Sequence, residues 1–440
     1  MSASKLQSNN LIDNIPANWN TTSLRFLLKK KITDGPHETP EFVDEGYPFL
    51  SVDGIQKGEL VFEGCRFISE EAHVEYSKKV KPIKGDLLMG KAASTGKIAQ
   101  VKVDFEFSIW SPLAWIRPNE MISSDFLEFA LKSDYCQAQI EMLCTHSTQN
   151  NISMQDIPRI RIHHPTRNDQ DNISRFLKEK ISNLNIVEEQ LNLELNLLEE
   201  KRSALITQAV TKGLNPDVAM KETGLDWYPE VPSHWKLRRV KHIATISPSN
   251  VDKKKYDGQE EVRLANYVDV YYNDRITEKL ELMAATASEN EIAKFSLKAG
   301  DLIITKDSET WDDIAVSAFV PATMEGVVCG YHLTLIRPNQ ENVLGEFLFR
   351  TYQALGVRDQ YHYNANGVTR YGLGSYWVDN GVVPIPPLDE QHVIAEYIDK
   401  NLQIMKEGEV NILSQIEKLK EFRISLTSAA VTGKIDVQSL

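Results

Sequence analysis

The sequence has no long apolar run and few cysteines, and both absences exclude classes of protein. No stretch reaches the roughly 18 consecutive apolar residues that a membrane-spanning helix needs, and residues 1–10 lack the apolar core of a secretion signal. The four cysteines, at positions 65, 136, 144 and 329, show no Cys-x-x-Cys spacing and have no nearby histidine pairs. This spacing favours reduced, partly buried thiols over a disulfide framework or a zinc site. We expect a soluble cytoplasmic protein without a metal site.

The sequence also lacks the motifs by which enzymes of nucleotide and nucleic-acid chemistry are recognised. An adenine methyltransferase needs a glycine-rich cofactor loop and an Asn/Asp-Pro-Pro-aromatic motif, and neither occurs. Residues 90–98 come nearest to a nucleotide-binding loop, but the spacing of their glycines is too long by one residue, and Ile98 stands where a magnesium-binding hydroxyl belongs. The common hydrolase and metalloprotease signatures are absent as well. We expect no catalytic residue and no cofactor in this chain, with a cryptic enzyme as one alternative.

The chain has a net charge of −13, which argues against a protein that coats nucleic acid without regard to sequence. One segment departs from this balance. Residues 78–103 contain lysines 78, 79, 81, 84, 91, 97 and 102 against a single acid, Asp86, which is a local charge of +6. Such a concentration favours contact with phosphates, and an ordinary solvated face is the alternative.

The two halves of the chain repeat each other. The apolar-Pro-x-x-Trp pattern at 15–19 returns at 231–235, and Lys-Gly-Asp-Leu-Leu at 84–88 is answered by Ala-Gly-Asp-Leu-Ile at 299–303. From about residue 146 to 213 the offset between the copies stays at 221 without a gap. A common order with a nearly constant offset is hard to obtain by chance, so the sequence predicts two similar modules.

Each copy begins with a mixed segment and ends with a helical one. Residues 24–120 carry short β-branched and aromatic runs punctuated by glycine and proline, which is typical of strands and turns. Residues 124–143 have a helical pattern. Residues 169–211 contain no proline or glycine and have the composition of one long helix.

The two long helices carry an apolar residue at every seventh position. These residues are Leu177, Leu184, Leu191, Leu198 and Leu205 in the first copy and Ile398, Met405, Ile412, Leu419 and Leu426 in the second. The spacing forms one apolar stripe on each helix, which a solitary helix could not leave in water. We expect the helices to pair with each other because one chain holds both at high effective concentration. Two ordinary core helices, or pairing with another chain, are the alternatives. At about 1.5 Å per residue each helix would span on the order of 60 Å.

Two polar loops in each copy carry side chains suited to DNA. In the first copy they are a loop at 90–97, which we expect to be flexible, and residues 146–151. In the second copy they are residues 306–313 and 364–371. Hydroxyls and ammoniums suit phosphates, and Gln, Asn and Arg pair bidentately with adenine or guanine edges; ordinary turn formation is the alternative. The candidates are Lys91, Ser94, Thr95, Lys97, Ser147, Thr148, Gln149 and Asn151, and then Lys306, Asp307, Ser308, Asn366, Thr369, Arg370 and Tyr371. Because the loop at 306–313 is acidic, we expect the two modules to read different sequences.

These stretches together resemble the DNA specificity subunit of type I restriction-modification systems. The resemblance covers nearly the whole chain. Its strongest marker is Pro-Pro-Leu-Asp-Glu-Gln at 386–391, from which the first copy departs at 164–170. The other markers are residues 228–235, 84–88, 299–303, 430–434, 367–373, and 34–37 with 46–49.

The resemblance implies two target-recognition domains, each reading half of a bipartite DNA site, joined by two helices that act as spacer and docking surface. It also implies two methylation subunits, which bring S-adenosylmethionine, and restriction subunits, which need ATP and magnesium. This chain would then be non-catalytic. The family-like loop at 34–37 adds His37 to the residues expected to contact DNA. A scaffold protein without a nucleic-acid role is the rival interpretation.

The expected fold is α+β, with two similar target-recognition domains separated by two long antiparallel helices that form an intramolecular coiled coil with pseudo-two-fold symmetry. A dyad axis relates the two strands of DNA, so two modules that read opposite strands are expected to be related by the same axis. The helices between them must then run antiparallel, which places Trp19 near the end of the second helix. The expected segments are an N-terminal tail 1–22, a recognition domain 23–167, a helix 168–213, a connector 214–238, a second recognition domain 239–387, and a C-terminal helix 388–440.

Overall fold

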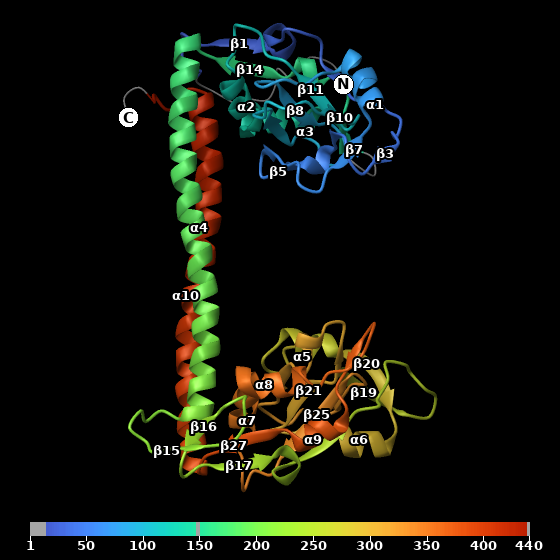
Figure 1. Ribbon diagram of the computed structural model, residues 1–440, viewed down its shortest axis with the longest axis vertical. Helices are drawn as coiled ribbons and strands as arrows, with labels where there is room; N and C mark the ends of the chain where they lie inside the picture. Colours follow the sequence, from blue (N-terminus) through green and yellow to red (C-terminus); the bar gives the residue numbers. More distant parts are fainter. Residues whose placement is uncertain (1–14, 147–149, 438–440) are drawn as a thin grey trace. The chain divides into compact units, whose positions relative to one another are not determined.

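The computed structural model describes residues 15–146 and 150–437, and its contacts divide the chain into two units (Figure 1). Unit 1 comprises Met1–Leu191 with Leu413–Leu440, and unit 2 comprises Asn192–Ile412. Each unit contains one mixed module together with part of each long helix. The six segments expected from the sequence divide the chain more finely than this, and they stay a prediction.

The module of unit 1 contains two four-stranded sheets, ordered β10-β4-β7-β3 and β2-β11-β8-β9. Its strands are β1 (Asn20–Ser23), β2 (Thr33–Asp34), β3 (Phe42–Val43), β4 (Tyr47–Leu50), β5 (Ile55–Gln56), β6 (Glu59–Leu60), β7 (Arg66–Ile68), β8 (Leu87–Gly90), β9 (Ile98–Gln100), β10 (Ser108–Ile109), β11 (Leu113–Ile116), β12 (Cys144–His146), β13 (Asn150–Ile152) and β14 (Arg161–His164). Its helices are α1 (Glu70–Lys79), α2 (Ser124–Lys132) and α3 (Asp134–Leu143).

Local sequence explains these elements. The strand β8 is entirely buried, as its continuous apolar run requires of a central strand. Helix α1 is capped at its N-terminus by Ser69, whose side chain accepts a hydrogen bond from the Ala72 N–H. Acids occupy the first turn of α1 and lysines its last turn, which suits the helix dipole.

The module of unit 2 repeats this plan with sheets ordered β18-β25-β21-β23 and β20-β19-β24. Its strands are β15 (Met220–Glu222), β16 (Glu230–Pro232), β17 (Lys236–Arg239), β18 (Ala244–Pro248), β19 (Glu260–Ala265), β20 (Met283–Ala287), β21 (Leu302–Thr305), β22 (Asp307–Ser308), β23 (Ser317–Phe319), β24 (Val327–Cys329), β25 (Leu333–Pro338), β26 (Tyr371–Gly372) and β27 (Val382–Ile385). Its helices are α5 (Tyr267–Tyr272), α6 (Glu289–Phe295), α7 (Gly345–Gln353), α8 (Leu355–His362) and α9 (Ser375–Asn380).

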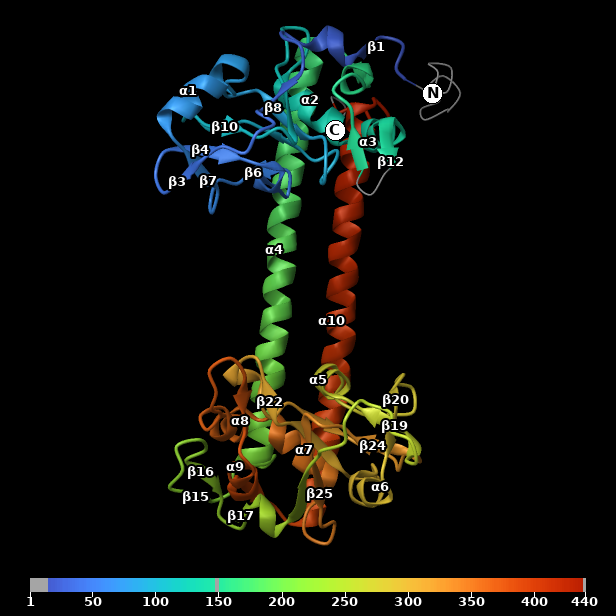
Figure 2. The ribbon, with the colours of Figure 1, turned by 90° about the vertical axis from the view of Figure 1, so that its right-hand side faces the viewer.

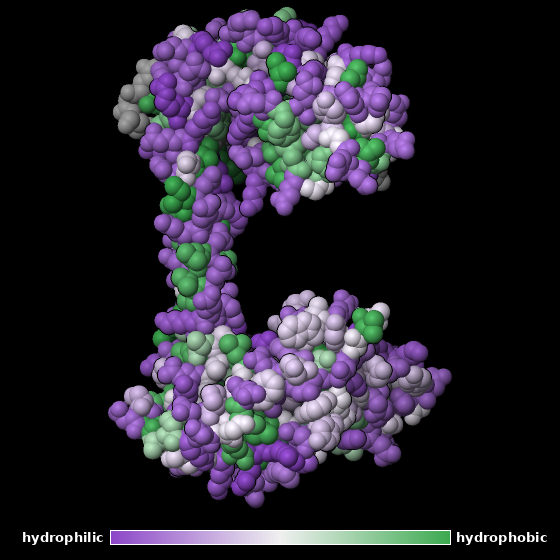
Figure 3. All heavy atoms as spheres, viewed as in Figure 1, coloured by the Kyte–Doolittle hydropathy of each residue, from purple (hydrophilic) through white to green (hydrophobic). Residues whose placement is uncertain are grey.

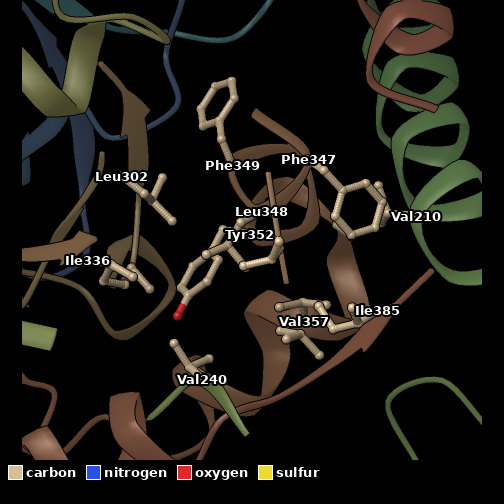
Figure 4. Close-up of a cluster of buried hydrophobic side chains, with 14 of the residues drawn as sticks. Val210, Val240, Leu302, Ile336, Phe347, Leu348, Phe349, Tyr352, Val357 and Ile385 are labelled. Carbon is tan, nitrogen blue, oxygen red and sulfur yellow. The ribbon is translucent and has the colours of Figure 1, made fainter. Parts of the chain in front are cut away.

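The long helices are part of the module cores. Figure 4 shows Val210 of helix α4 (Arg167–Lys212) in the same apolar cluster as Phe347 and Tyr352 of α7. Ile398 of helix α10 (Leu388–Val431) belongs to that cluster too. In unit 1 the Asp134 N–H donates to Ser428 Oγ at 2.8 Å, and Figure 2 shows α3 beside the last turns of α10. Each module is therefore anchored on the helices and not tethered to them by a loop.

The two helices run antiparallel. In unit 1 the first turns of α4, with Leu177, share a core with Val431 at the end of α10, and Glu188 pairs with Arg423 at 2.6 Å. In unit 2 the last turns of α4 share a core with the first turns of α10. All ten positions of the predicted stripes are buried or half-buried, whereas neighbouring apolar residues such as Leu193 are exposed. The predicted pairing within the chain is confirmed.

A buried glutamine joins module and helix in both units. Gln391 Oε1 accepts from the Leu344 N–H at 2.8 Å, and its amide donates to two backbone carbonyls. Gln170 Oε1 likewise accepts from the Ser123 N–H at 2.8 Å, and its amide also donates to two backbone carbonyls. The first copy departs from the family-like motif around this residue, but its glutamine contact is retained.

The departure affects the preceding acid instead. In the second copy, Glu390 accepts from the Trp235 indole at 3.1 Å and lies 2.8 Å from His234 Nε2. Asp169 occupies the corresponding position in the first copy, and its carboxylate accepts from the Thr166 hydroxyl at 2.7 Å. Both helices are followed by a glycine with positive φ, Gly213 at 75° and Gly433 at 73°.

The segment around Trp19 lies where the sequence analysis expects it. A Cβ atom on Gly433 would stand 2.6 Å from Pro16 and 3.2 Å from Trp19, so these side chains pack directly against the end of α10. A Cβ atom on Gly213 would stand 3.2 Å from Trp235 in the same way. Glycine suits both positions, because the left-handed conformation and the close aromatic contact would both strain a residue with a side chain.

Candidate nucleic-acid interface

The two polar loops predicted in module 1 meet in space. Ala92 forms a β-bridge with Asn151, and the Ile152 N–H donates to the Lys91 carbonyl at 2.9 Å. The Thr95 hydroxyl donates to the Asn150 carbonyl at 2.6 Å. The loop at 90–97 and the β12–β13 hairpin therefore form one surface. Ser147, Thr148 and Gln149 lie outside the described residues, and Asn151 beside them is exposed.

The loop at 90–97 is closed by backbone hydrogen bonds, whereas the sequence analysis expects a flexible loop. Gly90 and Lys97 are joined by an N–H···O bond of 2.8 Å, and Gly96 donates to the Gly90 carbonyl at 2.9 Å. A Cβ atom on Gly90 would stand 2.4 Å from the Ser94 carbonyl oxygen, so the glycine permits the close approach. Ser94 is half-buried and Lys97 is exposed.

Two lysines and one histidine converge on the buried carboxylate of Asp34 at the base of this surface. Lys79 Nζ lies 2.8 Å from Oδ1, His37 Nε2 lies 3.1 Å from Oδ2, and Lys91 pairs with Oδ2. Burial alone would raise the pKa of Asp34, but the hydrogen bonds and charges of Lys79 and Lys91 outweigh it and hold the pKa below its usual value. Lys91 keeps only 12 % of its side chain exposed, so its ammonium is engaged inside the module.

The local charge of +6 expected from the sequence is largely neutralised. Six of the seven lysines in residues 78–103 form ion pairs: Lys78 with Glu75, Lys79 and Lys91 with Asp34, Lys81 with Glu106, Lys84 with Asp104, and Lys102 with Glu59. All five of these acids lie outside residues 78–103, so a count of charge within the stretch misses them. Lys97 is the one lysine of the segment to which the described residues supply no ion pair.

The two predicted loops of module 2 meet through the same pairing. Strands β22 and β26 place Asp307 opposite Gly372 and Ser308 opposite Tyr371. The Leu373 N–H donates to the Lys306 carbonyl at 2.8 Å, as Ile152 does to Lys91. The loops therefore correspond between the modules in three dimensions as well as in sequence.

Lys306 and Ser308 turn into the module and not toward solvent. The Lys306 ammonium donates to the Ser249 carbonyl at 2.8 Å and lies over the Tyr331 ring, and burial lowers its pKa. Ser308 is buried and its hydroxyl accepts from the Tyr267 hydroxyl at 3.2 Å. Its burial does not agree with the DNA contact predicted for it, because pairing of β22 with β26 directs the side chain inward.

The other predicted residues of module 2 stand on a closed turn. Asn366 and Gly372 exchange two backbone hydrogen bonds, of 3.1 and 2.9 Å, and Thr369 and Asn366 are exposed. Arg370 is half-exposed and lies 2.6 Å from Asp307 Oδ1. The other carboxylate oxygen of Asp307 lies 2.9 Å from His332 Nδ1, and Tyr371 is half-buried in β26.

Sequence reasoning missed Asp34 and His332, the two residues that hold the predicted side chains in place. Asp34 stands in a loop that the family resemblance marks, but nothing in its spacing shows that lysines 45 and 57 residues away will pair with it. His332 carries no motif at all. Both are recognisable only once strands distant in sequence are aligned.

A family model described as the type I restriction modification DNA specificity domain matches residues 16–197 and 232–418. The chain belongs to this family. It is 19 % identical over 434 residues to the type I restriction enzyme StySPI specificity subunit of Salmonella potsdam, a match that covers 96 % of this chain and 90 % of the relative. Each matched range contains one module with its pair of loops. Sequence-specific DNA recognition is therefore the function of the chain, and the scaffold interpretation is not favoured.

Solved structures show the same fold. The HsdS subunit from Thermoanaerobacter tengcongensis superposes with a TM-score of 0.56 at 13 % identity, covering 97 % of this chain and all of that one. A chain from a structure of the assembly and conformational transition of the type I R-M system gives a TM-score of 0.70 at 13 % identity, covering 96 % of this chain and 100 % of that one. At such identities the likeness concerns the fold alone.

Neither a metal cluster nor a membrane span is found within the described ranges. There, no three or more His, Cys, Asp or Glu side chains are grouped so that they could hold a metal ion. No helix there is both long and apolar enough to cross a membrane. All four cysteines are free thiols; Cys136 and Cys329 are buried, and Cys65 and Cys144 are half-buried.

Proposed function

We propose that this specificity subunit reads a bipartite DNA site, one half with each module. The observation that carries the proposal is that the same two loops meet by the same strand pairing in both modules, while their chemistry differs. The loop at 90–97 contains lysines and hydroxyls, and the loop at 306–313 contains acids and a tryptophan. A constant scaffold with different loop residues is what recognition of two different half-sites needs.

The subunit directs the chemistry of its partners and performs none itself. The sequence contains no motif for methyl transfer or nucleotide hydrolysis, which supports a complex in which S-adenosylmethionine, ATP and magnesium are bound by other chains. Those chains are two methylation subunits and the restriction subunits, assembled in the cytoplasm. The specificity subunit brings them to DNA and selects the site.

The helices supply the surface for the methylation subunits. Large apolar side chains stand outside the paired stripe, each roughly half exposed: Ile186, Leu193, Leu197, Ile404, Val410, Leu413, Phe422 and Ile424. They give apolar areas on the surface of the helices (Figure 3). Exposed apolar area of this kind is typical of protein–protein contacts. Because both helices carry such residues, the subunit offers two similar surfaces, which suits two copies of one partner.

Exchange of one module tests the proposal. Residues 239–387 are replaced by the corresponding part of another specificity subunit, and the chimera is expressed with its methylation subunits. Sequencing of methylated adenines in the host DNA should show that one half of the site has changed and the other half is intact, because the modules have separate cores. If both halves change together, or if no site is methylated by the unchanged complex, the proposal is wrong.

A further inference from the structure

Arg370 is held in place by a carboxylate that is itself held by a histidine. Its guanidinium Nη2 lies 2.6 Å from Asp307 Oδ1, and Asp307 Oδ2 lies 2.9 Å from His332 Nδ1. Half of the Arg370 side chain is exposed, but only 19 % of the Asp307 side chain is. His332 is hydrogen-bonded to Oδ2, whereas Oδ1 accepts no hydrogen bond from the described residues and forms an ion pair with Arg370, the member that faces out.

The backbone around this pair is fixed as well. Asp307 stands in β22, opposite Gly372 of β26, and the two bonds between Asn366 and Gly372 close the turn that carries Arg370. A Cβ atom on Gly367 would stand 1.9 Å from the Arg370 carbonyl oxygen, so the turn is as tight as glycine allows. An arginine on such a support loses little freedom when it binds, which favours geometric recognition.

The guanidinium retains donors for a ligand. Within the described part of the chain Asp307 supplies its one ionic contact, through Nη2. The planar fork of arginine matches the O6 and N7 acceptors of guanine in the major groove, which makes this the commonest specific contact between protein and DNA. The ion pair with Asp307 keeps the fork beside the loop at 306–313.

The same carboxylate makes Arg370 a poor anchor for phosphate. Asp307 offsets the charge of the arginine, and Glu309, Asp312 and Asp313 in the same loop add negative charge. Phosphate binding depends mainly on net positive charge, whereas a base edge is read by hydrogen bonds to uncharged acceptors. In module 1 the position that corresponds to Asp307 is Ala92, so the carboxylate belongs to the arginine-bearing module and not to the common scaffold.

We propose that Arg370 reads a guanine in the half-site of the second module, and that Asp307 and His332 are its positioning residues. The inference rests on the proposed function, since it names a base within the site that this module reads. It changes the role of Asp307 from the DNA contact predicted by sequence to a support for the contact.

Modified bases test the contact directly. The methylated site is first determined for the full complex, and exchange of residues 239–387 shows which half the second module reads. Duplexes are then made with 7-deazaguanine, which lacks the N7 acceptor, at each guanine of that half. The unmodified complex should bind about 10-fold more weakly when one particular guanine is replaced. The Arg370→Ala complex should bind more weakly overall and be insensitive to the same replacement.

Charge-preserving and charge-removing variants separate base reading from phosphate contact. Arg370→Lys keeps the charge but loses the fork, so discrimination between cognate and random DNA should fall as it does with alanine. Asp307→Asn removes a negative charge near DNA, so binding to random duplexes should become tighter while discrimination falls. If Asp307 had a purely structural role, its replacement would not raise the affinity for random duplexes while lowering the discrimination between cognate and random DNA. Arg238→Ala, at an exposed arginine of β17 outside both loops, is the matched control and should leave discrimination unchanged.

Three results would overturn the inference. The first is a second half-site without guanine. The second is an Arg370→Ala complex that remains sensitive to 7-deazaguanine. The third is an equal loss on cognate and random DNA that Arg370→Lys restores, which would identify a phosphate contact. An unmodified complex without sequence preference would instead refute the proposed function, and the inference with it.

Discussion

Replacing Gln391 by methionine measures how strongly one buried amide joins a recognition module to its helix. The side chain is fully buried and makes three hydrogen bonds, from the Leu344 N–H at 2.8 Å and to the Asn342 and Pro386 carbonyls at 3.1 and 2.9 Å. Methionine fills a similar volume but leaves one donor and two acceptors without a partner. Since each unsatisfied buried group costs about 1–3 kcal/mol and carbonyls tolerate it best, we expect unit 2 to lose about 2–5 kcal/mol of unfolding free energy.

The first copy provides the matched control, because Gln170 makes the equivalent three bonds in unit 1. Urea denaturation monitored by hydrogen exchange and mass spectrometry is the suitable assay, because it reports on each unit separately and two units need not unfold in one transition. Gln391→Met should speed exchange in the module of unit 2 and leave that of unit 1 unchanged, and Gln170→Met should do the reverse. A loss below about 1 kcal/mol, or equal loosening of both modules by either variant, would refute the reasoning.

Four other substitutions, two of them combined, test the helix pair, the Asp34 carboxylate and the loop at 90–97. Arg423→Met should lower the unfolding free energy, measured by denaturant titration, by about 1–3 kcal/mol. The loss is smaller than for a fully buried ion pair because Glu188 is partly exposed. Adding Glu188→Leu to this variant should recover most of the lost unfolding free energy. Asp34→Asn should destabilise unit 1 at neutral pH. The folded-state pKa of Asp34 lies below 3.8, so its contribution is lost as pH falls through that lowered value, and thermal melts should show the difference from the unmodified protein shrinking only under acid conditions. Lys97→Ala should weaken binding to cognate and random DNA alike and reduce the salt slope by about 1 in titrations at several salt concentrations, and a loss confined to cognate DNA would contradict a phosphate contact.

The repeat, the long helices and their pairing could be predicted because each depends on a regular signal. The offset of 221 extends over the helices, and the seven-residue spacing specifies which face of each helix is covered. The position of Trp19 at the end of α10 followed from treating the two copies as equivalent. These features depend on order and period, which survive even where single residues differ, as at Asp169 and Glu390.

The loop chemistry was harder to predict because it depends on partners far apart in sequence. A count of charge in residues 78–103 finds seven lysines but none of the carboxylates that pair with six of them, since two of these acids, Asp34 and Glu59, come from other strands and loops. The inward direction of Ser308 likewise follows from the pairing of β22 with β26 and not from the loop itself. Only when the strand pairing is known can the polar loop residues that support the surface be distinguished from those expected to face DNA.

The lysine that follows the central strand shows this division in both modules. Lys91 comes directly after β8 and binds the Asp34 carboxylate at the end of β2, and Lys306 comes directly after β21 and binds the Ser249 carbonyl just beyond β18. Because β2 and β18 hold the same place in their sheets, the two ammoniums do the same task with different acceptors. Each ammonium binds the start of its loop to a neighbouring strand, so this lysine belongs to the scaffold that the two modules share and not to the residues that read DNA. If Arg370 reads a guanine as proposed, base recognition lies farther along the same loops, where a side chain can change without disturbing the lysine contact beneath it.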